Sequence, residues 1–485
     1  MIAHFTRAAA ALVLLGAPAA AFAQDDLAAI AAIDDAGPQL NAVIVAKDPA
    51  ILAREIAAAR GLPLGGRTVL VKDNIETREW PTTAGSLALQ DNATGRDAPL
   101  IARLRAAGGV VLGKTNLSEW ANIRSTRSTS GWSAVGGLTR NPHALNRNAC
   151  GSSSGSGAAV AAGLAWAAIG TETDGSITCP ASINGVVGFK PTVGMVSRTY
   201  VVPISHSQDT AGPLARSVAD AAVLLNAIAG GNRADPATAE ADRHKTDFTA
   251  GLAGASLQGV RIGVLRKQAG TNPGVTTLFD WALADLAKAG AVLVQIDFDP
   301  PSKLGDDELS VMMLELREDL GKYLAGSPAP IPVRTLHQVI AFDDAHPLEE
   351  MRWFGQELFL KADKATDRVA YLKARAASLD AAGAHGIDRL LRLHHVRLLV
   401  APTAGPAWTT DLVNGDHFDS TGAGNLAAIA GYPHLSVPMG AVEGLPVGLS
   451  IIGPKWSDAA VLAAGAAYER ARTAKLLAPS YRPGD

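Results

Sequence analysis

Apolar residues follow two alternating patterns along this chain. Continuous apolar runs of about four to eight residues are typical of buried strands, whereas apolar residues three and four positions apart are typical of helices with one buried face. Leu100, Ile101, Leu104 and Ala107 have the helical spacing, and Gly108 follows them as a stop signal. Because the two patterns alternate over most of the chain, the sequence predicts an α/β protein.

The predicted elements can be given by their residue numbers. We expect strands at 66–73, 109–113, 260–265, 291–298, 397–401, 435–438 and 447–452. We expect helices over most of 25–60 and at 99–108, 158–169, 217–229, 276–289, 308–324, 348–379 and 458–473. The polar, turn-rich segment 125–148 predicts a long loop that forms one wall of an open cleft. No linker or repeat divides residues 24–485, so they are expected to form one domain.

The first 23 residues have the three parts of a secretory signal peptide. Arg7 supplies the positive charge, residues 8–15 are apolar, and Ala21-Phe22-Ala23 fits the small-x-small cleavage rule. The apolar run is too short to span a bilayer, so no stable membrane insertion is expected. We therefore predict a mature chain that starts at Gln24 and is periplasmic or extracellular. The alternatives are a retained anchor or a frayed cytosolic terminus.

Composition narrows the classes of partner. The 485 residues carry a formal charge of −3, 48% of them are hydrophobic, and no basic run occurs. A nucleic-acid partner or an anionic-membrane surface is therefore unsupported, and the oligomeric state stays open. Cys150 and Cys179 are the two cysteines. We favour small buried residues without a bridge, although export would also permit a disulfide.

Candidate chemistry gathers in two serine-bearing glycine turns and one lysine. The turns begin at Cys150 and Thr171, and Ser176 follows a tight bend in the second. The backbone N–H groups of Thr173, Asp174, Gly175 and Ser176 are placed to stabilise a developing negative charge. Lys72 ends an apolar strand, where burial favours its neutral form. A neutral Lys72 could deprotonate Ser152, and Ser152 could deprotonate Ser176, without a histidine, metal or cofactor.

These residues resemble those of the amidase signature family. The matching motifs are Val-Lys-Asp-Asn (71–74), Gly-Lys-Thr-Asn-Leu-Ser-Glu-Trp (113–120), Gly-Ser-Ser-Ser-Gly-Ser (151–156), Gly-Ser-Ile (175–177), Gly-Phe-Lys-Pro-Thr (188–192) and Asp-Thr-Ala-Gly-Pro-Leu-Ala-Arg (209–216). The resemblance implies a single large domain with a central mixed sheet flanked by helices. It also implies a triad of Ser176 as acylated nucleophile, Ser152 as bridging serine after a cis peptide bond, and Lys72 as base, with oxyanion donors from 173–176.

Within that family, the segment 171–180 and the export signal look most like those of bacterial peptide amidases, which hydrolyse C-terminal peptide amides. Many relatives carry an arginine after Gly-Ser-Ile that recognises a carboxylate, whereas this chain has Thr178. We therefore expect a small-molecule or peptide amide as substrate. Thr178, Ala121 and Ser153 are the further residues expected to contact the substrate or its neighbours.

Other interpretations of the same residues are weaker. A broad small-amide or ester hydrolase of the same family is the main alternative. Gly151-Ser-Ser-Ser-Gly also fits a nucleophile elbow centred on Ser153, but an elbow needs a strand directly before it. A non-enzymatic protein that binds phosphate with a glycine-rich loop is a distant third interpretation, since the Gly-Lys-Ser/Thr ending of the Walker motif is missing. Adjacent His394 and His395 would not face one ligand on a helix, so no metal site is expected there.

Overall fold

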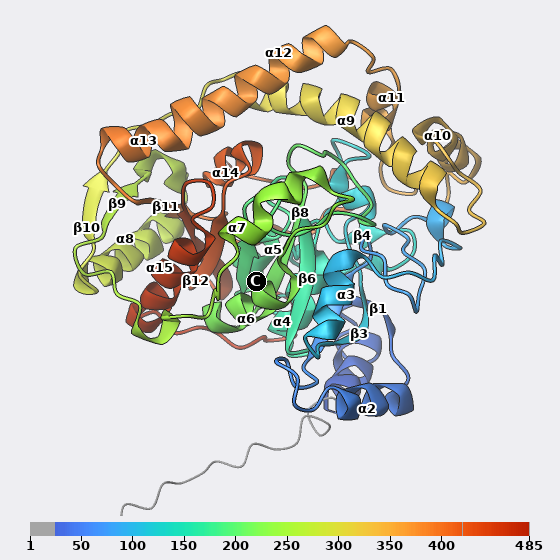
Figure 1. The fold of residues 1–485 in the computed structure, drawn as a ribbon, viewed down its shortest axis with the longest axis horizontal. Helices are drawn as coiled ribbons and strands as arrows, with labels where there is room; N and C mark the ends of the chain where they lie inside the picture. Colours follow the sequence, from blue (N-terminus) through green and yellow to red (C-terminus); the bar gives the residue numbers. More distant parts are fainter. Residues whose placement is uncertain (1–24, 420, 485) are drawn as a thin grey trace, which may run out of the picture.

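The computed structural model describes residues 25–419 and 421–484, so the predicted leader lies outside them. Within these ranges eleven strands form one sheet, and helices cover both of its faces (Figure 1). In spatial order the strands are β1 (Val43–Ala46), β3 (Val110–Thr115), β2 (Thr68–Lys72), β6 (Ala167–Glu172), β8 (Thr210–Ala215), β7 (Val187–Lys190), β12 (His434–Val442), β13 (Leu445–Ile452), β11 (Leu398–Pro402), β9 (Arg261–Val264) and β10 (Val292–Gln295).

The sheet is mixed, as the family resemblance implied. The neighbours β3–β2–β6 and β11–β9–β10 run parallel, and the other pairs run antiparallel. A separate hairpin consists of β4 (Trp132–Ser133) and β5 (Gly137–Leu138). The α-helices are α2 (Pro49–Ala58), α3 (Pro99–Ala106), α4 (Ser154–Ala161), α5 (Thr178–Ile183), α6 (Val218–Ile228), α7 (Ala241–His244), α8 (Pro273–Lys288), α9 (Leu304–Gly326), α10 (Leu336–Ala345), α11 (Glu357–Asp363), α12 (Arg368–Leu379), α13 (Asp388–Leu393), α14 (Gly424–Ala430) and α15 (Asp458–Ala471).

The register of β2 and β6 brings two distant segments to one edge of the sheet. Both strands are fully buried, and Val71 pairs with Ile169 in the parallel ladder. Parallel strands end at the same edge, so Lys72 at the end of β2 emerges beside Thr171 near the end of β6. This edge is where the serine-bearing turns are placed.

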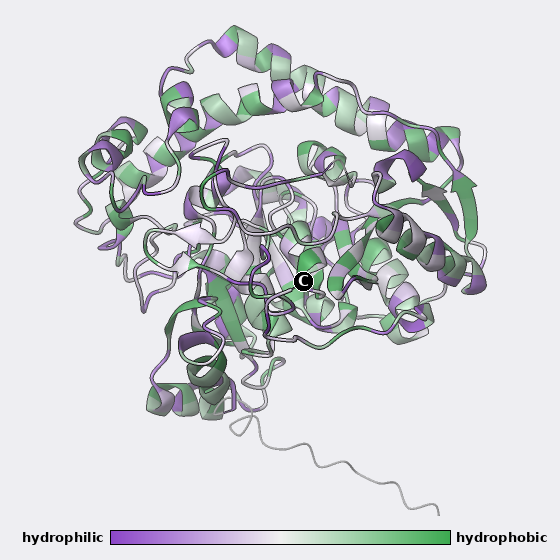
Figure 2. Ribbon diagram, turned by 180° about the vertical axis from the view of Figure 1, so that it is seen from behind, coloured by the Kyte–Doolittle hydropathy of each residue, from purple (hydrophilic) through white to green (hydrophobic). Residues whose placement is uncertain are grey.

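The long helices α9 and α12 form a separate layer above the sheet. They lie side by side along one border of the molecule (Figure 1), and the view from behind shows polar and apolar residues mixed along them (Figure 2). Leu316 and Leu320 of α9 belong to a hydrophobic cluster that is distinct from the clusters on the faces of the sheet. Further members of that cluster come from α10 and α11. No helix in the described ranges is long and apolar enough to cross a membrane.

Several predicted element boundaries were wrong. The helical segment expected over 25–60 contains β1, which pairs antiparallel with β3. The helix expected over 158–169 ends at Ala161, because Gly163 adopts a φ of +72° and β6 follows. The helix expected over 348–379 is broken, and α12 begins afresh where the Asp367 carboxylate accepts hydrogen bonds from two backbone N–H groups.

Candidate active site

Lys72 lies at the base of the candidate site with its ammonium nitrogen completely enclosed. Its side chain is 0% exposed, and Nζ lies 2.7 Å from Oγ of Ser152. Nζ also contacts Thr171, at 2.9 Å from Oγ1 and 3.3 Å from the carbonyl oxygen. The Asn74 amide donates to the same Oγ1 at 2.9 Å. Thr171 and Asn74 therefore fix the position of the lysine beside Ser152.

The electrostatics at this position favour a neutral amine. Burial lowers the pKa of Lys72 from its ordinary value near 10.5 to about 7, against the opposing effect of the Asp209 and Glu172 carboxylates. Desolvation is thus stronger than the two attractions. A lysine with this pKa is about half neutral at pH 7, and its neutral form can accept a proton from a serine hydroxyl.

Ser152 is held by backbone contacts on both sides. The Gly151–Ser152 peptide bond is cis, as the resemblance implied. The Ser152 carbonyl oxygen accepts a hydrogen bond from the N–H of Ser118 at 3.1 Å. Helix α4 starts directly afterwards and packs so closely that a methyl group on Gly155 would overlap the backbone of Ala42 and Asn116. The glycines of this segment therefore serve close packing beneath the serine.

Ser176 lies in a turn whose backbone is free to bind an anion. Within the described part of the chain, the N–H groups of Asp174, Gly175 and Ser176 donate no hydrogen bond to another protein group. Gly175 has a φ of +76°, which favours glycine at this bend. Ser176 lines a pocket and is 9% exposed. The arrangement has the form of an oxyanion hole beside a nucleophile.

The two serine-bearing turns are joined directly. The N–H of Ser153 donates to the carbonyl oxygen of Ser176 at 3.1 Å. A disulfide also connects Cys150, two residues before Ser152, to Cys179, three residues after Ser176. The expectation of two unbridged cysteines was wrong, since their Cα atoms lie 6.0 Å apart, within bridging range. Spacing in sequence could not reveal this distance.

The pocket that contains Ser176 has a volume of about 250 Å³. The described residues that line it are Ala121, Asn122, Ile123, Cys150, Gly151, Thr173, Asp174, Gly175, Ser176, Cys179, Ile204, Met312 and Phe418. Ala121 therefore reaches the pocket, as expected. The loop 125–148 contributes no lining residue and is largely buried, so its expected role as a cleft wall was wrong. Met312 of α9 and Phe418 form that wall instead.

Two other expected substrate contacts lie outside this pocket. Ser153 is 0% exposed, and its hydroxyl bridges the backbone carbonyl and N–H of Thr171 at 3.1 and 3.2 Å. No strand directly precedes it, which also removes the elbow interpretation. Thr178 is 1% exposed, and both its N–H and its hydroxyl donate to the carboxylate of Glu172. Both residues support the turns rather than face a ligand.

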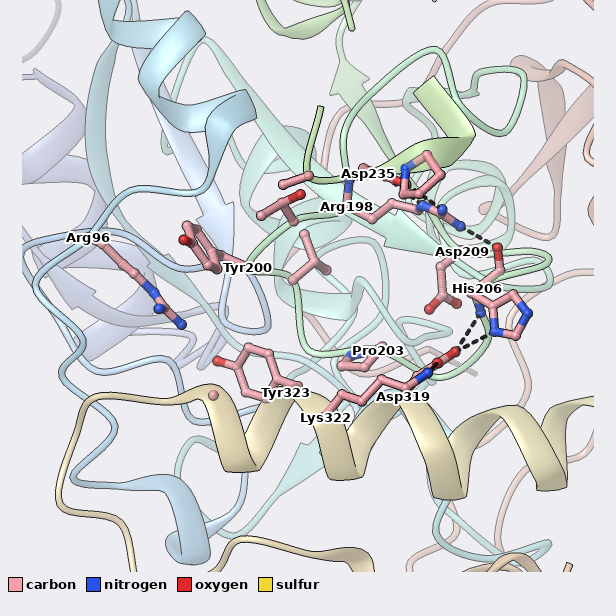
Figure 3. A pocket seen from close by; sticks show the side chains of 15 residues that line it. Arg96, Arg198, Tyr200, Pro203, His206, Asp209, Asp235, Asp319, Lys322 and Tyr323 are labelled. Carbon is pink, nitrogen blue, oxygen red and sulfur yellow. Dashed lines mark hydrogen bonds and ion pairs between the residues drawn. The ribbon is translucent and has the colours of Figure 1, made fainter. Parts of the chain in front are cut away.

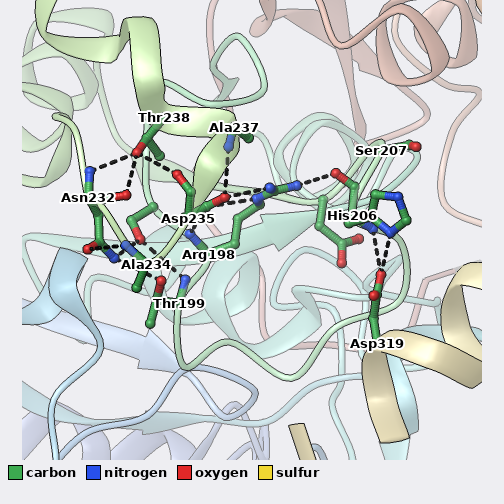
Figure 4. Close-up of polar contacts among 12 residues, drawn as sticks. Arg198, Thr199, His206, Ser207, Asn232, Ala234, Asp235, Ala237, Thr238 and Asp319 are labelled. Carbon is green, nitrogen blue, oxygen red and sulfur yellow. Dashed lines mark hydrogen bonds and ion pairs between the residues drawn. The ribbon is translucent and has the colours of Figure 1, made fainter. Parts of the chain in front are cut away.

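A second pocket of about 520 Å³ is lined mainly by the segment 198–209 and by the end of α9 (Figure 3). Its charged groups largely bind one another: Arg198 pairs with Asp235 at 2.7 Å, and His206 Nδ1 lies 2.7 Å from Asp319 (Figure 4). Asp209 connects this pocket to the catalytic turn, because its carboxylate accepts from the Thr173 hydroxyl at 2.6 Å. Burial raises the pKa of Asp209 to about 6. This pocket supports the turn and contains neither Ser152 nor Ser176.

Among the described residues, one group of side chains could hold a metal ion, and two of its three members line that second pocket. His206, Glu315 and Asp319 place one ligand atom each within 4.8 Å of one another. Glu315 already accepts hydrogen bonds from the hydroxyls of Ser207 and Tyr371. The three side chains therefore anchor the loop after residue 203 on α9, and the chemistry of the serine turns needs no ion from them.

Sequence reasoning missed the groups that support and enclose the site. Thr171 and Asn74 both contact the Lys72 region, and the parallel strand ends were the available signal for Thr171. Met312 lies more than 100 residues beyond Ser176 in sequence, and helical periodicity does not indicate that it faces a pocket. Its role follows only from the path of α9.

Comparison with known proteins places this geometry in a family. A family model described as Amidase matches residues 27–462. The crystal structure of the peptide amidase PAM with the competitive inhibitor chymostatin is 47% identical, with a TM-score of 0.90 and 96% of each chain covered. The native peptide amidase from Stenotrophomonas maltophilia is 46% identical, with a TM-score of 0.89 and the same coverage.

More distant relatives share the family. A protein of Arabidopsis thaliana described as a probable amidase is 36% identical over 458 residues, which cover 91% of this chain and 85% of that protein. The crystal structure of an amidase family protein from Bacillus anthracis is 32% identical, with a TM-score of 0.86 and coverage of 96% of this chain and 90% of that one. The family match spans nearly all of the described chain and includes the lysine and both serine turns. This chain is an amidase of the amidase signature family.

Proposed function

We propose that this amidase is an exported enzyme that hydrolyses C-terminal amides of peptides to the free acid and ammonia, through an acyl-enzyme on Ser176. The observation that carries the proposal is the 2.7 Å contact between Lys72 and Ser152, directly beside the pocket that contains Ser176. Similarity to peptide amidases over 96% of the chain supports the choice of substrate class.

The first half of the reaction forms the acyl-enzyme. Neutral Lys72 accepts the proton of Ser152, and Ser152 accepts the proton of Ser176 as the Ser176 oxygen attacks the amide carbon. The carbonyl oxygen becomes an oxyanion, which the unpaired N–H groups of the turn 174–176 stabilise. The C–N bond then breaks, and the amide nitrogen leaves as ammonia with a proton returned through Ser152.

The second half regenerates the enzyme. Water enters the position that ammonia leaves, and the same relay removes a proton from it. Its oxygen attacks the ester carbon of the acyl-enzyme, the ester bond to Ser176 breaks, and Ser152 returns the proton to the Ser176 oxygen. The products are a carboxylic acid and a free serine hydroxyl, so no further reactant is needed.

The expected substrate is a neutral primary amide on a peptide. The described lining residues include no lysine, arginine or histidine that would pair with a carboxylate. We expect ammonia release from a set of peptide amides, with internal peptide bonds intact and free-acid peptides unchanged by mass spectrometry. Small neutral amides and esters run beside them represent the alternative, a broad small-amide or ester hydrolase. Faster cleavage of those compounds than of peptide amides would contradict the assignment to peptide amides and support the alternative.

Export is proposed from the sequence of residues 1–23 and is supported by the Cys150–Cys179 bridge, because disulfides persist mainly in oxidising compartments. Secretion of the full chain from a host with a periplasm should release a protein whose first residue is Gln24. N-terminal sequencing of the periplasmic fraction measures this. Active, soluble protein that retains Met1 would contradict export.

A further inference from the structure

The pocket around Ser176 has one charged lining residue among those described, and that residue is an acid. Asp174 belongs to the oxyanion turn and lines the pocket. The remaining lining residues are apolar or neutral. Charges of one sign that line a cleft raise the local concentration of ligands of the opposite sign.

A second carboxyl group, that of Glu308, lies next to the turn that contains Asp174. Glu308 on α9 is 5% exposed, and Gln208 connects it to the oxyanion turn, because the Gln208 amide donates to the Thr173 carbonyl oxygen at 3.3 Å. The same Gln208 amide donates to Glu308 Oε1 at 2.7 Å. Glu308 is thereby fixed against the turn that contains Ser176.

The surroundings of Asp174 and Glu308 prevent both carboxyl groups from carrying a negative charge at once near neutral pH. Burial raises the pKa of Asp174 well above its ordinary range, and Glu308 and Glu172 raise it further, while Lys190 opposes them. Burial also raises the pKa of Glu308, to about 7. The pair therefore titrates as a unit, with its first ionisation near neutrality.

We propose that Asp174 and Glu308 form an anionic specificity element that favours peptide amides whose last residue has a basic side chain and disfavours those whose last residue is acidic. The inference rests on the proposed function and defines its substrate class. In a peptide the α-nitrogen of the last residue is a neutral amide, so the cation nearest the reacting carbon is that residue's own side chain. Lysine and arginine amides match the charge of the pocket.

The test uses substrates that differ in charge but little in shape. N-acetyl-lysinamide is compared with N-acetyl-norleucinamide, and the α-amide of N-acetyl-glutamate with that of N-acetyl-glutamine. At pH 8 we expect kcat/KM to favour lysine over norleucine, and glutamine over glutamate, by about tenfold each, the factor that corresponds to one pKa unit of interaction. Each comparison is a ratio, so the titration of Lys72 cancels from it.

The pH dependence of the lysine-to-norleucine ratio separates charge from shape. The ratio should rise as pH increases through about 7, because ionisation of the pair adds the negative charge while the lysine side chain stays protonated. A ratio that stays constant between pH 6 and pH 8.5 would contradict the proposal, and this measurement needs only the unaltered enzyme.

Variants identify the two residues. Asp174→Asn or Glu308→Gln alone leaves one carboxyl group, which ionises at lower pH than the pair. The lysine-to-norleucine ratio should therefore persist at pH 8, and the pH at which it rises should be lower than in the wild type. The double variant removes the charge, and its ratio should approach one. Asp306→Asn, an exposed acid on the same helix, is the matched control. A double variant that keeps the wild-type ratio would overturn the inference. Failure of the wild-type enzyme to cleave N-acetyl-norleucinamide would instead overturn the proposed function.

Discussion

Alanine at position 176 is expected to reduce kcat for a neutral peptide amide by about 10⁴-fold or more, since no acyl-enzyme can form without the Ser176 hydroxyl. The turn should keep its conformation, because its contacts use backbone atoms: the Ser176 carbonyl accepts from Ser153, and the Gly175 carbonyl accepts from Cys179. Ammonia release under saturating substrate measures the loss. If Ser176→Ala binds the substrate with a Kd close to the wild-type KM, the pocket of the variant is intact.

The position of the acyl group provides the second measurement. Mass spectrometry of the wild-type enzyme with a slowly released substrate should place the acyl group on Ser176. Ser256→Ala, at an exposed serine remote from the pocket, should keep wild-type turnover and serves as the control. An acyl group on Ser153 would reject Ser176 as the nucleophile. Turnover by Ser176→Ala within tenfold of wild type would reject it too, because that loss is about three orders of magnitude smaller than the loss expected.

Methionine in place of Lys72 is expected to abolish turnover while preserving the buried stem of the side chain. Without the amine, Ser152 has no partner that can take its proton. In the wild-type enzyme kcat/KM for a neutral amide should rise with pH and reach its midpoint at about 7, the lowered pKa of Lys72. A midpoint near the ordinary lysine value of about 10.4 would show that burial does not activate this amine.

The same shift predicts how the variant's stability depends on pH. The folded-state pKa of Lys72 is below its unfolded value, so between about pH 7 and pH 10 the unfolded state binds the extra proton. The contribution of Lys72 to the free energy of unfolding of the wild type is therefore lower at pH 7 and increases toward pH 10. Lys72→Met lacks the effect, so its free energy of unfolding relative to wild type should fall as pH rises through that window. Urea unfolding of both proteins at several pH values measures the difference.

A second buried lysine supplies the control. Lys190 is also fully enclosed, and burial lowers its pKa to about 8, but its Nζ contacts the Pro191 carbonyl and no serine. Lys190→Met should retain turnover with its pH midpoint unchanged. If Lys190→Met loses activity and Lys72→Met keeps it, the assigned base is wrong.

The sequence predicted the chemistry of the site better than its enclosure. Lys72, Ser152 and Ser176 lie within short motifs, where residue type and spacing carry the information, and the structure brings their segments together as expected. The end of an apolar strand also predicted that Lys72 is buried. These properties depend on neighbours within a few residues along the chain.

Properties set by distant neighbours could not be predicted in this way. The Cys150–Cys179 bridge depends on how two turns meet across α4 and β6. The resemblance to relatives with an arginine at this position implied a ligand contact for Thr178, but its hydroxyl donates to the buried carboxylate of Glu172 instead. Glu308 and Met312 reach the site from a helix more than 100 residues away in sequence. Long-range packing decides each of these outcomes.

The layer that contains α9 has a consequence for how such enzymes diversify. Lys72, Ser152 and Ser176 are positioned by the sheet and by backbone contacts between turns, whereas Glu308 and Met312 belong to a helix anchored in its own hydrophobic cluster. Changes at the inward face of α9 can therefore alter which amide is accepted without disturbing the residues that cleave it. Natural variation, or a mutant library confined to that helix face, can explore new substrates at little risk to the catalytic machinery.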